Sequence, residues 1–259
     1  MKEIFVTGRT LPEAYHKALF ELDAQGDVIS CNDWDQQQKE VSMTFCVEKP
    51  MNEPMVSRLY IGGFRELQQY VMEVLDGILD FKIGDGDCWE YTYHDRVVNF
   101  NGFNQLEFVI NELKRSKDSR RAVISIRDNA VDPFNNDPAC LQHIQYFIRD
   151  NKLHCKVMMR SNDAAEATFM NAFAFIMMQK KIADALDAEM GTYTHRANSF
   201  HCYEKNFDLM KQYIDGIKNK DIGEITYEYE DFYKELMLES IPKIEKVVAE
   251  LKDEMAGKA

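Results

Sequence analysis

The chain has 259 residues, with 31 Lys and Arg against 44 Asp and Glu, so its formal net charge is −13. This charge disfavours general binding to nucleic acids or anionic membranes, because the overall field repels polyanions. No apolar run reaches the ~20 residues that span a bilayer. The six cysteines show no metal-ligand spacing, which is typical of reduced thiols. We therefore expect a cytoplasmic protein that binds neither nucleic acid nor membrane and holds no metal, with any phosphate site made by a local cluster of arginines. The cysteines are Cys31, Cys46, Cys88, Cys140, Cys155 and Cys202.

Hydrophobic periodicity predicts three helices and one strand in the first half of the chain. Apolar residues recur at helical spacing over 11–23, where Pro12 occupies an early helical position, and again over 64–80 and 103–115. Residues 41–47 alternate in part between apolar and polar side chains, which indicates a strand.

The second half mixes short strands with two helices. Strands are expected at 122–126, at 141–149 and at 153–159, the last two joined by an Asp150–Asn151 turn, and a strand or loop at 193–203. Residues 164–186 are apolar nearly all round, which predicts a buried central helix, and 231–255 predict an acidic surface helix.

The chain shows no internal repeat, no low-complexity tract and no linker rich in Pro, Gly or Ser, so we expect a single domain over 1–259. Helices and strands alternate without βαβ regularity, which favours an α+β fold over a doubly wound sheet.

Cys140 is the leading candidate nucleophile. It lies between a loop and a strand, and Arg160 follows twenty residues later in Arg160-Ser161-Asn162-Asp163. An arginine aimed at a thiol lowers the pKa of that thiol, and the same planar group can bind a phosphate. The alternatives are a small buried cysteine and an arginine in a structural salt bridge.

Further polar residues stand in places that favour a ligand. Arg120 and Arg121 form a basic pair before a strand, although such pairs are often only solvated. Asn171 interrupts an apolar helix, where an amide needs a hydrogen-bond partner or a ligand. Glu73 lies among apolar neighbours, so its pKa is expected to be raised, unless it lies at a solvated rim.

Ser199, His201 and Tyr203 alternate along one segment and would share a face that suits sugar hydroxyls or phosphate.

The glycine pairs match neither a P-loop nor a dinucleotide fingerprint. No cluster of His, Cys and carboxylates has zinc spacing.

In this order the motifs resemble thymidylate synthase and the pyrimidine nucleotide C5-hydroxymethylases. The similarity runs from about Glu73 to Tyr203, and the intervals from Cys140 to Arg160, Asn171 and His201 keep the family register. The resemblance implies a mixed sheet packed with helices and an obligate homodimer that forms through the sheet. It also implies dUMP or a related nucleotide as substrate and 5,10-methylenetetrahydrofolate as co-substrate.

The resemblance also implies roles for the matched residues. Cys140 would add to C6 of the pyrimidine, Glu73 would relay protons, and Asn171 would read the base, its amide favouring uridylate. Arg160 and Ser161 would bind the phosphate, Arg120 and Arg121 would bind the phosphate of the other subunit, and Arg9 would make an N-terminal phosphate contact. His201 and Tyr203 would bind the sugar 3′ hydroxyl. Asp163 would contact the folate, and Trp89 would form an aromatic wall for it.

Several positions depart from the usual synthase pattern. Leu141 replaces a histidine, Met159 a glutamine and Ala167 a glycine, while Ser199 stands where synthases usually carry Asp, as in hydroxymethylases. The acidic 231–255 helix also replaces a short apolar tail.

Three hypotheses follow. The first is a thymidylate synthase that methylates dUMP to dTMP. The second is a hydroxymethylase acting on dUMP, dCMP or CMP, in which water replaces hydride. The third is a nucleotide-binding dimer without turnover, which the presence of Cys140, Glu73 and Asn171 disfavours.

Overall fold

The computed structural model describes residues 1–84 and 89–257, so Cys88 lies outside the described residues. A mixed sheet runs through the molecule in the order β1-β3-β8-β7-β6-β5, and β2 pairs with β3 outside this path. The β1–β3 and β7–β8 pairs are parallel and the others antiparallel. Its strands are β1 Glu3–Gly8, β2 Asp27–Cys31, β3 Gln36–Val47, β5 Val123–Ser125, β6 Leu141–Arg149, β7 Lys152–Asp163 and β8 Glu189–Tyr203. Strands β4 (Val56–Ser57) and β9 (Thr226–Tyr227) form a separate small pair.

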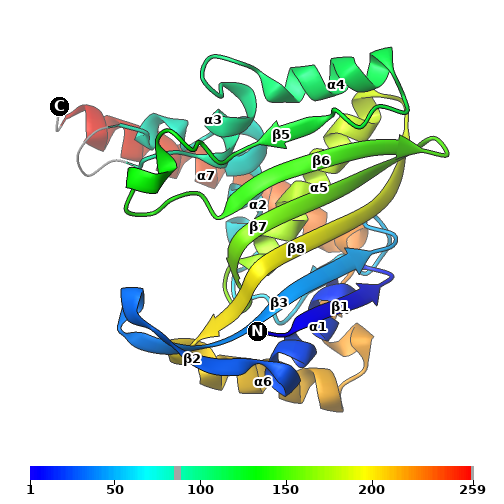
Figure 1. The fold of residues 1–259 in the computed structure, drawn as a ribbon, viewed down its shortest axis with the longest axis vertical. Helices are drawn as coiled ribbons and strands as arrows, with labels where there is room; N and C mark the ends of the chain where they lie inside the picture. Colours follow the sequence, from blue (N-terminus) through cyan, green and yellow to red (C-terminus); the bar gives the residue numbers. More distant parts are fainter. Residues whose placement is uncertain (85–88, 258–259) are drawn as a thin grey trace.

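The helices gather mainly on one side of this sheet (Figure 1). They are α1 Leu11–Gln25, α2 Phe64–Asp76, α3 Tyr93–Val98, α4 Gln105–Arg115, α5 Thr168–Ala185, α6 Phe207–Asn219 and α7 Lys234–Ala256. Helix α5 lies against β7 and β8, while α2 packs between α5 and α7. The fold is therefore α+β with a mixed sheet and helices packed on it, as the sequence predicted.

The periodicities located most elements, and local backbone chemistry set their ends. The helices predicted at 11–23, 103–115 and 164–186 correspond to α1, α4 and α5. The helix predicted over 64–80 is wrong at its C-terminus, because Gly77 adopts a left-handed conformation (φ 65°) and ends α2 at Asp76. The Asp150–Asn151 turn is confirmed, with both residues at positive φ, 50° and 58°.

Helix α5 begins at Thr168 rather than at 164. The Asp163 carboxylate accepts hydrogen bonds from the main-chain amides of Ala165 (2.8 Å) and Glu166 (3.1 Å), which shapes a turn before the helix. The strand predicted at 153–159 extends over Lys152–Asp163, and 193–203 belongs to the longer strand β8.

The sheet has one covered and one open face. Along β6, Ile144, Tyr146 and Ile148 are buried and alternate with more accessible residues. Figure 1 shows α5, α2 and α7 behind the strands, and of the described helices none crosses the near side of β6, β7 and β8. Phe5 of β1 is 65% exposed, so the edge of the sheet also carries apolar surface.

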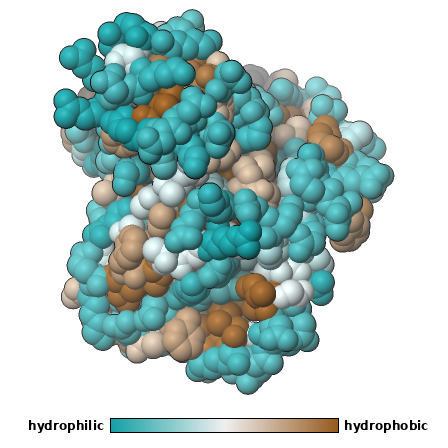
Figure 2. Space-filling model, turned by 90° about the vertical axis from the view of Figure 1, so that its right-hand side faces the viewer, coloured by the Kyte–Doolittle hydropathy of each residue, from teal (hydrophilic) through white to brown (hydrophobic). Residues whose placement is uncertain are grey.

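The face in Figure 2 is mostly hydrophilic, and apolar side chains appear there as separate patches. No helix in the described part of the chain is long and apolar enough to cross a membrane.

Candidate active site

A cavity of about 510 Å³ opens between α2 and the segment before α3. Its volume falls in the range of ligand pockets, roughly 300–1,000 Å³. Tyr70, Glu73 and Val74 line it from α2, residues 89–93 form a second wall, and Asn136 and Asp137 close it from the loop that leads to Cys140. The cavity therefore brings together Glu73 and Trp89, which the sequence singled out, and the approach to the candidate nucleophile.

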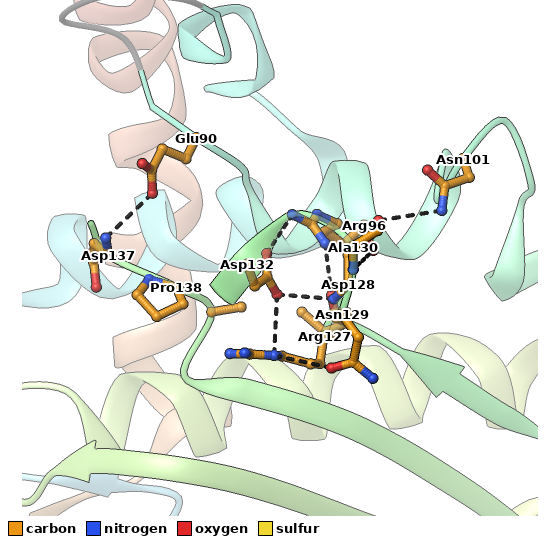
Figure 3. A network of polar contacts seen from close by, with 12 residues as sticks. Glu90, Arg96, Asn101, Arg127, Asp128, Asn129, Ala130, Asp132, Asp137 and Pro138 are labelled. Carbon is orange, nitrogen blue, oxygen red and sulfur yellow. Dashed lines mark hydrogen bonds and ion pairs between the residues drawn. The ribbon is translucent and has the colours of Figure 1, made fainter. Parts of the chain in front are cut away.

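The loop before Cys140 is fixed by a buried ion pair (Figure 3). Asp132 is fully buried, and its carboxylate accepts hydrogen bonds from Arg96 Nη2 (2.8 Å) and from the main-chain amide of Asp128 (2.9 Å). Arg96 Nη1 also donates to the carbonyl of Ile126 (3.1 Å). Arg96 of α3 thus holds both ends of the 126–132 segment. This segment precedes Asn136 and Asp137, which line the cavity.

A second contact fixes the part of this loop nearest Cys140. The Glu90 carboxylate accepts from the amides of Asn136 (3.1 Å) and Asp137 (3.3 Å), as Figure 3 shows for Asp137. Four residues after Asp137, the amide of Leu141 donates to the Tyr93 hydroxyl (3.2 Å). The Cys140 backbone is therefore held from both sides by the wall of the cavity.

Arg160 supports the same loop through its guanidinium group. Its Nη2 donates to the carbonyl of Pro138 (2.6 Å) and its Nε to the carbonyl of Ala139 (3.2 Å). In the part of the chain that the structure describes, Arg160 has no carboxylate within salt-bridge distance, so its charge is not neutralised by another side chain. The structural salt bridge, which was the alternative interpretation of Arg160, is absent from the described residues.

The expected activation of Cys140 by Arg160 is outweighed by burial. Burial raises the pKa of the Cys140 thiol above its ordinary value, Arg160 lowers it in part, and Asp137 adds to the rise. Without a ligand, the thiol form is therefore favoured at neutral pH. A thiolate would require further positive charge or a proton acceptor at the site.

Glu73 lies half-buried in the cavity wall. Burial raises the pKa of its carboxyl, while a hydrogen bond from Gln69 Nε2 (2.9 Å) and the charge of Lys82 act in the opposite direction. A carboxyl with a raised pKa holds a proton more readily than an ordinary glutamate, which suits a proton relay. Trp89 is 42% exposed and lines the same cavity, with Lys82 Nζ 4.6 Å from the centre of its ring.

Asn171 is 4% exposed, and its amide is bonded on both sides. Its Nδ2 donates to the Tyr70 hydroxyl (2.7 Å), and its Oδ1 accepts from Asn162 Nδ2 (3.3 Å). Tyr70 lines the cavity, so Asn171 is one hydrogen bond from the cavity wall. One Nδ2 hydrogen and one lone pair of Oδ1 remain for a ligand.

The ends of β7 and β8 carry the other predicted substrate ligands side by side. Ser161 pairs with Ser199, and Asp163 pairs with His201, in the parallel register. His201 is 3% exposed, and its Nε2 has no hydrogen-bond partner in the described chain. Tyr203 meets the His201 ring edge to face at 4.6 Å. A buried nitrogen without a partner favours a ligand at this place.

Asp163 and His201 also affect each other's protonation. Burial raises the pKa of the Asp163 carboxyl and lowers that of the His201 imidazole, and the attraction between their charges opposes both shifts. Asp163 Oδ1 already accepts hydrogen bonds from the amides of Ala165 and Glu166, before α5. The other carboxylate oxygen, Oδ2, is the one available to a bound molecule.

The arginine pair lies elsewhere within this chain. Arg120 and Arg121 are exposed before the edge strand β5, in a surface hollow shared with Arg115 and Glu112, and neither lines the cavity of Glu73. Arg9 is exposed in the turn between β1 and α1, where its amide donates to Glu13 (2.9 Å).

Several residues around the site were missed by the sequence reading. They are Tyr70, Glu90, Tyr91, Tyr93, Arg96, Asp132, Asn162 and His195. Two of them offered a local signal. Tyr70 lies three residues before Glu73 and so on the same helix face, and Asn162 belongs to the motif from Arg160 to Asp163, where it was given no role. The others meet the site through contacts between distant segments.

A half-buried cysteine, a carboxyl with raised pKa and a cation without a carboxylate partner in the described chain are groups used together in covalent catalysis by cysteine. The thymidylate synthase family model matches residues 63–251. A Methanocaldococcus jannaschii protein with the name "Putative thymidylate synthase" is 28% identical over 215 residues, which are 79% of this chain and 93% of that protein. The thymidylate synthase of Bacillus mojavensis is 27% identical over 133 residues, 51% of this chain and 47% of that enzyme.

The thermostable thymidylate synthase A of Bacillus subtilis has a similar fold, with a TM-score of 0.65 at 16% identity over 84% of this chain and 92% of that one. The chain belongs to the thymidylate synthase family. It is therefore an enzyme that transfers one-carbon groups, from a family that binds dUMP and uses methylenetetrahydrofolate as co-substrate. Among residues 1–84 and 89–257 no group of His, Cys, Asp and Glu has the arrangement of a metal site.

Proposed function

We propose that this protein is a thymidylate synthase, a cytoplasmic homodimer that methylates dUMP at C5 to give dTMP through a covalent adduct at Cys140. The observation that carries the proposal is the grouping of Glu73, Trp89 and the Asn171–Tyr70 pair around one cavity whose loop wall leads into Cys140. The family's co-substrate suits a cavity of about 510 Å³ with an indole in its wall.

The proposed chemistry begins with a weak carbon nucleophile. The Cys140 sulfur adds to C6 of uracil, and the electron pair of the C5–C6 bond moves to C5 and O4 as an enolate. C5 then attacks the methylene carbon of the folate, whose bond to N10 opens. Loss of the C5 hydrogen as a proton then breaks the bond between the methylene and N5, which frees tetrahydrofolate and leaves an exocyclic methylene at C5. Glu73, with its raised pKa, serves the proton transfers, and Asn171 faces the base at O4 and N3. Hydride from tetrahydrofolate adds to the exocyclic methylene to give the methyl group, the C5–C6 double bond re-forms as the C6–sulfur bond breaks, and dihydrofolate is left.

Substrate binding in this proposal uses the ends of β7 and β8. Arg160 and Ser161 bind the phosphate, and Arg160 has no competing carboxylate in the described chain. His201 offers its unpartnered Nε2 to the sugar 3′ hydroxyl beside Tyr203. Asp163 and Trp89 contact the folate.

The homodimer completes the phosphate site. The open face of the sheet forms the interface, and Arg120 and Arg121 reach the phosphate in the partner's cavity, since within their own chain they lie outside it. The exposed positions of both arginines support this assignment.

Mixing two inactive variants tests the shared site. Cys140→Ser and Arg121→Ala homodimers are each expected to be inactive, but a mixed dimer has one site with both an intact cysteine and an intact arginine. A refolded equimolar mixture should therefore regain about a quarter of wild-type activity, as expected for random pairing in a two-fold dimer. No recovery, with mixed dimers demonstrated by a tag, would contradict the placement of Arg121 across the interface.

The second candidate function is the hydroxymethylase, in which water replaces hydride in the last step. Ser199 favours it, because synthases usually carry Asp at this position. Helix α7 also departs from the synthase pattern, which has a short apolar tail, and it packs on α2 through Ile244 and Val248. Both candidates share every step up to loss of the C5 hydrogen.

Release of tritium from C5-labelled dUMP tests the shared part of the proposal. We expect release that depends on methylenetetrahydrofolate. Release that occurs only from dCMP would contradict dUMP as the substrate, and no release from either nucleotide would contradict the proposed chemistry.

A further inference from the structure

We propose that Tyr193, His195 and Asn162 are positioning residues that hold the Asn171 amide in one of its two orientations and so set the discrimination between uracil and cytosine. The inference rests on the proposed function, because it assigns the control of base choice at the same site.

The four residues form one buried line of hydrogen bonds. The Tyr193 hydroxyl lies 2.8 Å from His195 Nδ1, and His195 Nε2 lies 2.9 Å from Asn162 Oδ1. Asn162 Nδ2 then donates to Asn171 Oδ1 (3.3 Å), and Asn171 Nδ2 donates to the Tyr70 hydroxyl (2.7 Å) at the cavity wall. Tyr193 and His195 are fully buried, and Asn162 is 4% exposed, so water does not substitute for these partners.

The direction of every bond in this line follows from the state of one imidazole. Burial lowers the pKa of His195 to about 3, so the ring is neutral at physiological pH and has one N–H donor. If Nε2 carries the hydrogen, His195 donates to Asn162 Oδ1, and Nδ1 accepts from the Tyr193 hydroxyl. Asn162 must then present its Nδ2 to Asn171, whose oxygen accepts. Each donor in the line faces an acceptor.

The reversed line leaves a buried group unpaired. If Nδ1 carried the hydrogen, it would donate to the Tyr193 oxygen, and both amides would have to turn over. The Tyr193 hydroxyl hydrogen would then lack an acceptor, since His195 Nδ1 is its one hydrogen-bond partner in the described chain. An unpaired buried hydroxyl is unfavourable, so the first direction prevails. The His195 ring is also stacked on Phe45 at 4.8 Å with an interplanar angle of 8°, which holds its plane.

A fixed amide orientation has a direct consequence for the base. Uracil presents an acceptor at O4 and a donor at N3, whereas cytosine presents a donor at N4 and an acceptor at N3. An asparagine that is free to turn over suits either base. Asn171 would have to turn over together with Asn162, and His195 would have to change tautomer, so the amide stays in one orientation and suits one base.

The test compares two hydroxyl deletions on strands of the same sheet, β8 and β6. Tyr193→Phe removes the hydroxyl that fixes the His195 tautomer, and Tyr146→Phe removes a hydroxyl from another fully buried tyrosine, on β6, that takes no part in the line. The readout is kcat/KM for tritium release from C5-labelled dUMP divided by that for dCMP. We expect Tyr193→Phe to lower this ratio by about tenfold, an effect typical of lost hydrogen-bond discrimination, and Tyr146→Phe to leave it unchanged.

Asn162→Leu, which removes the bond to Asn171 itself, should lower the ratio at least as far. If this variant does not fold, as judged by thermal melting, Tyr193→Phe carries the test. A purely structural role would reduce kcat/KM for both nucleotides equally, so an unchanged ratio in folded Tyr193→Phe would overturn the inference.

Failure of the proposed function gives a different result. Wild-type protein that releases tritium from neither nucleotide would contradict the proposed chemistry. The ratio of dissociation constants for dUMP and dCMP, measured by calorimetry in wild type and Tyr193→Phe, would then test the inference. A shift of this ratio towards dCMP in Tyr193→Phe would support it, and an unchanged ratio would overturn it.

Discussion

Cys140→Ser should lower kcat for tritium release from dUMP by about 10⁴-fold or more, because removal of a nucleophile eliminates the covalent route. A serine hydroxyl has a far higher pKa than a thiol, and the cavity offers it no strong base. The affinity for dUMP, measured by calorimetry, should change by less than about threefold, since the sulfur adds only after the nucleotide is bound.

Cys46→Ser is the matched control, because Cys46 is likewise a half-buried free cysteine, but it lies on β3 opposite Thr194 of β8 and has no part in the proposed site. It should keep nearly full activity. A Cys140→Ser protein that retains more than a tenth of wild-type turnover would contradict the covalent mechanism. Loss of nucleotide binding without loss of folding would show that Cys140 acts in binding.

Arg96→Met should destabilise the protein by about 3 kcal/mol, because it removes the 2.8 Å partner of the buried Asp132 carboxylate and leaves only the longer contact to Arg127 Nε at 3.9 Å. The side chains of Arg96 and Asp132 are 8% and 0% exposed, so water cannot replace the lost partner. Methionine keeps much of the apolar stem of arginine, so lost packing contributes little. The measurement is the free energy of unfolding from urea titration.

Arg65→Met is the control for this prediction. Arg65 pairs with Glu66 on the surface of α2, where the two side chains are 57% and 50% exposed. Such a pair contributes less than about 1 kcal/mol. Equal destabilisation by the two substitutions would show that the Arg96–Asp132 pair does not have the stabilising role that its burial indicates.

Residues whose signal lies within one element could be predicted from the sequence. Glu73 stands out as a carboxylate among apolar neighbours on one helix, and the structure places it in the cavity wall. Asn171 stands out in the same way in α5, and the structure bears out the helix–helix hydrogen bond weighed for it, since its amide donates to Tyr70 of α2, while its contact with the base stays a prediction. The alternation of 141–149 likewise predicted β6 with its ends.

Features that depend on distant segments could not be predicted in this way. His195 looks like any polar residue of a strand until β8 pairs with β7 and brings it to Asn162. Arg96 and Asp132 are separated by 36 positions, and neither shows a periodic pattern that would connect them. The pKa of the Cys140 thiol is a further example. Arg160 was predicted to lower this pKa, but burial raises it, and the extent of burial is set by the whole fold.

The most direct test of the account is the identity of the nucleotide formed from dUMP and methylenetetrahydrofolate. The measurement combines product mass with the absorbance change that reports dihydrofolate. We expect a nucleotide that has gained one CH₂, formed together with an equal amount of dihydrofolate. A nucleotide that has gained CH₂O without dihydrofolate would contradict the synthase and identify a hydroxymethylase.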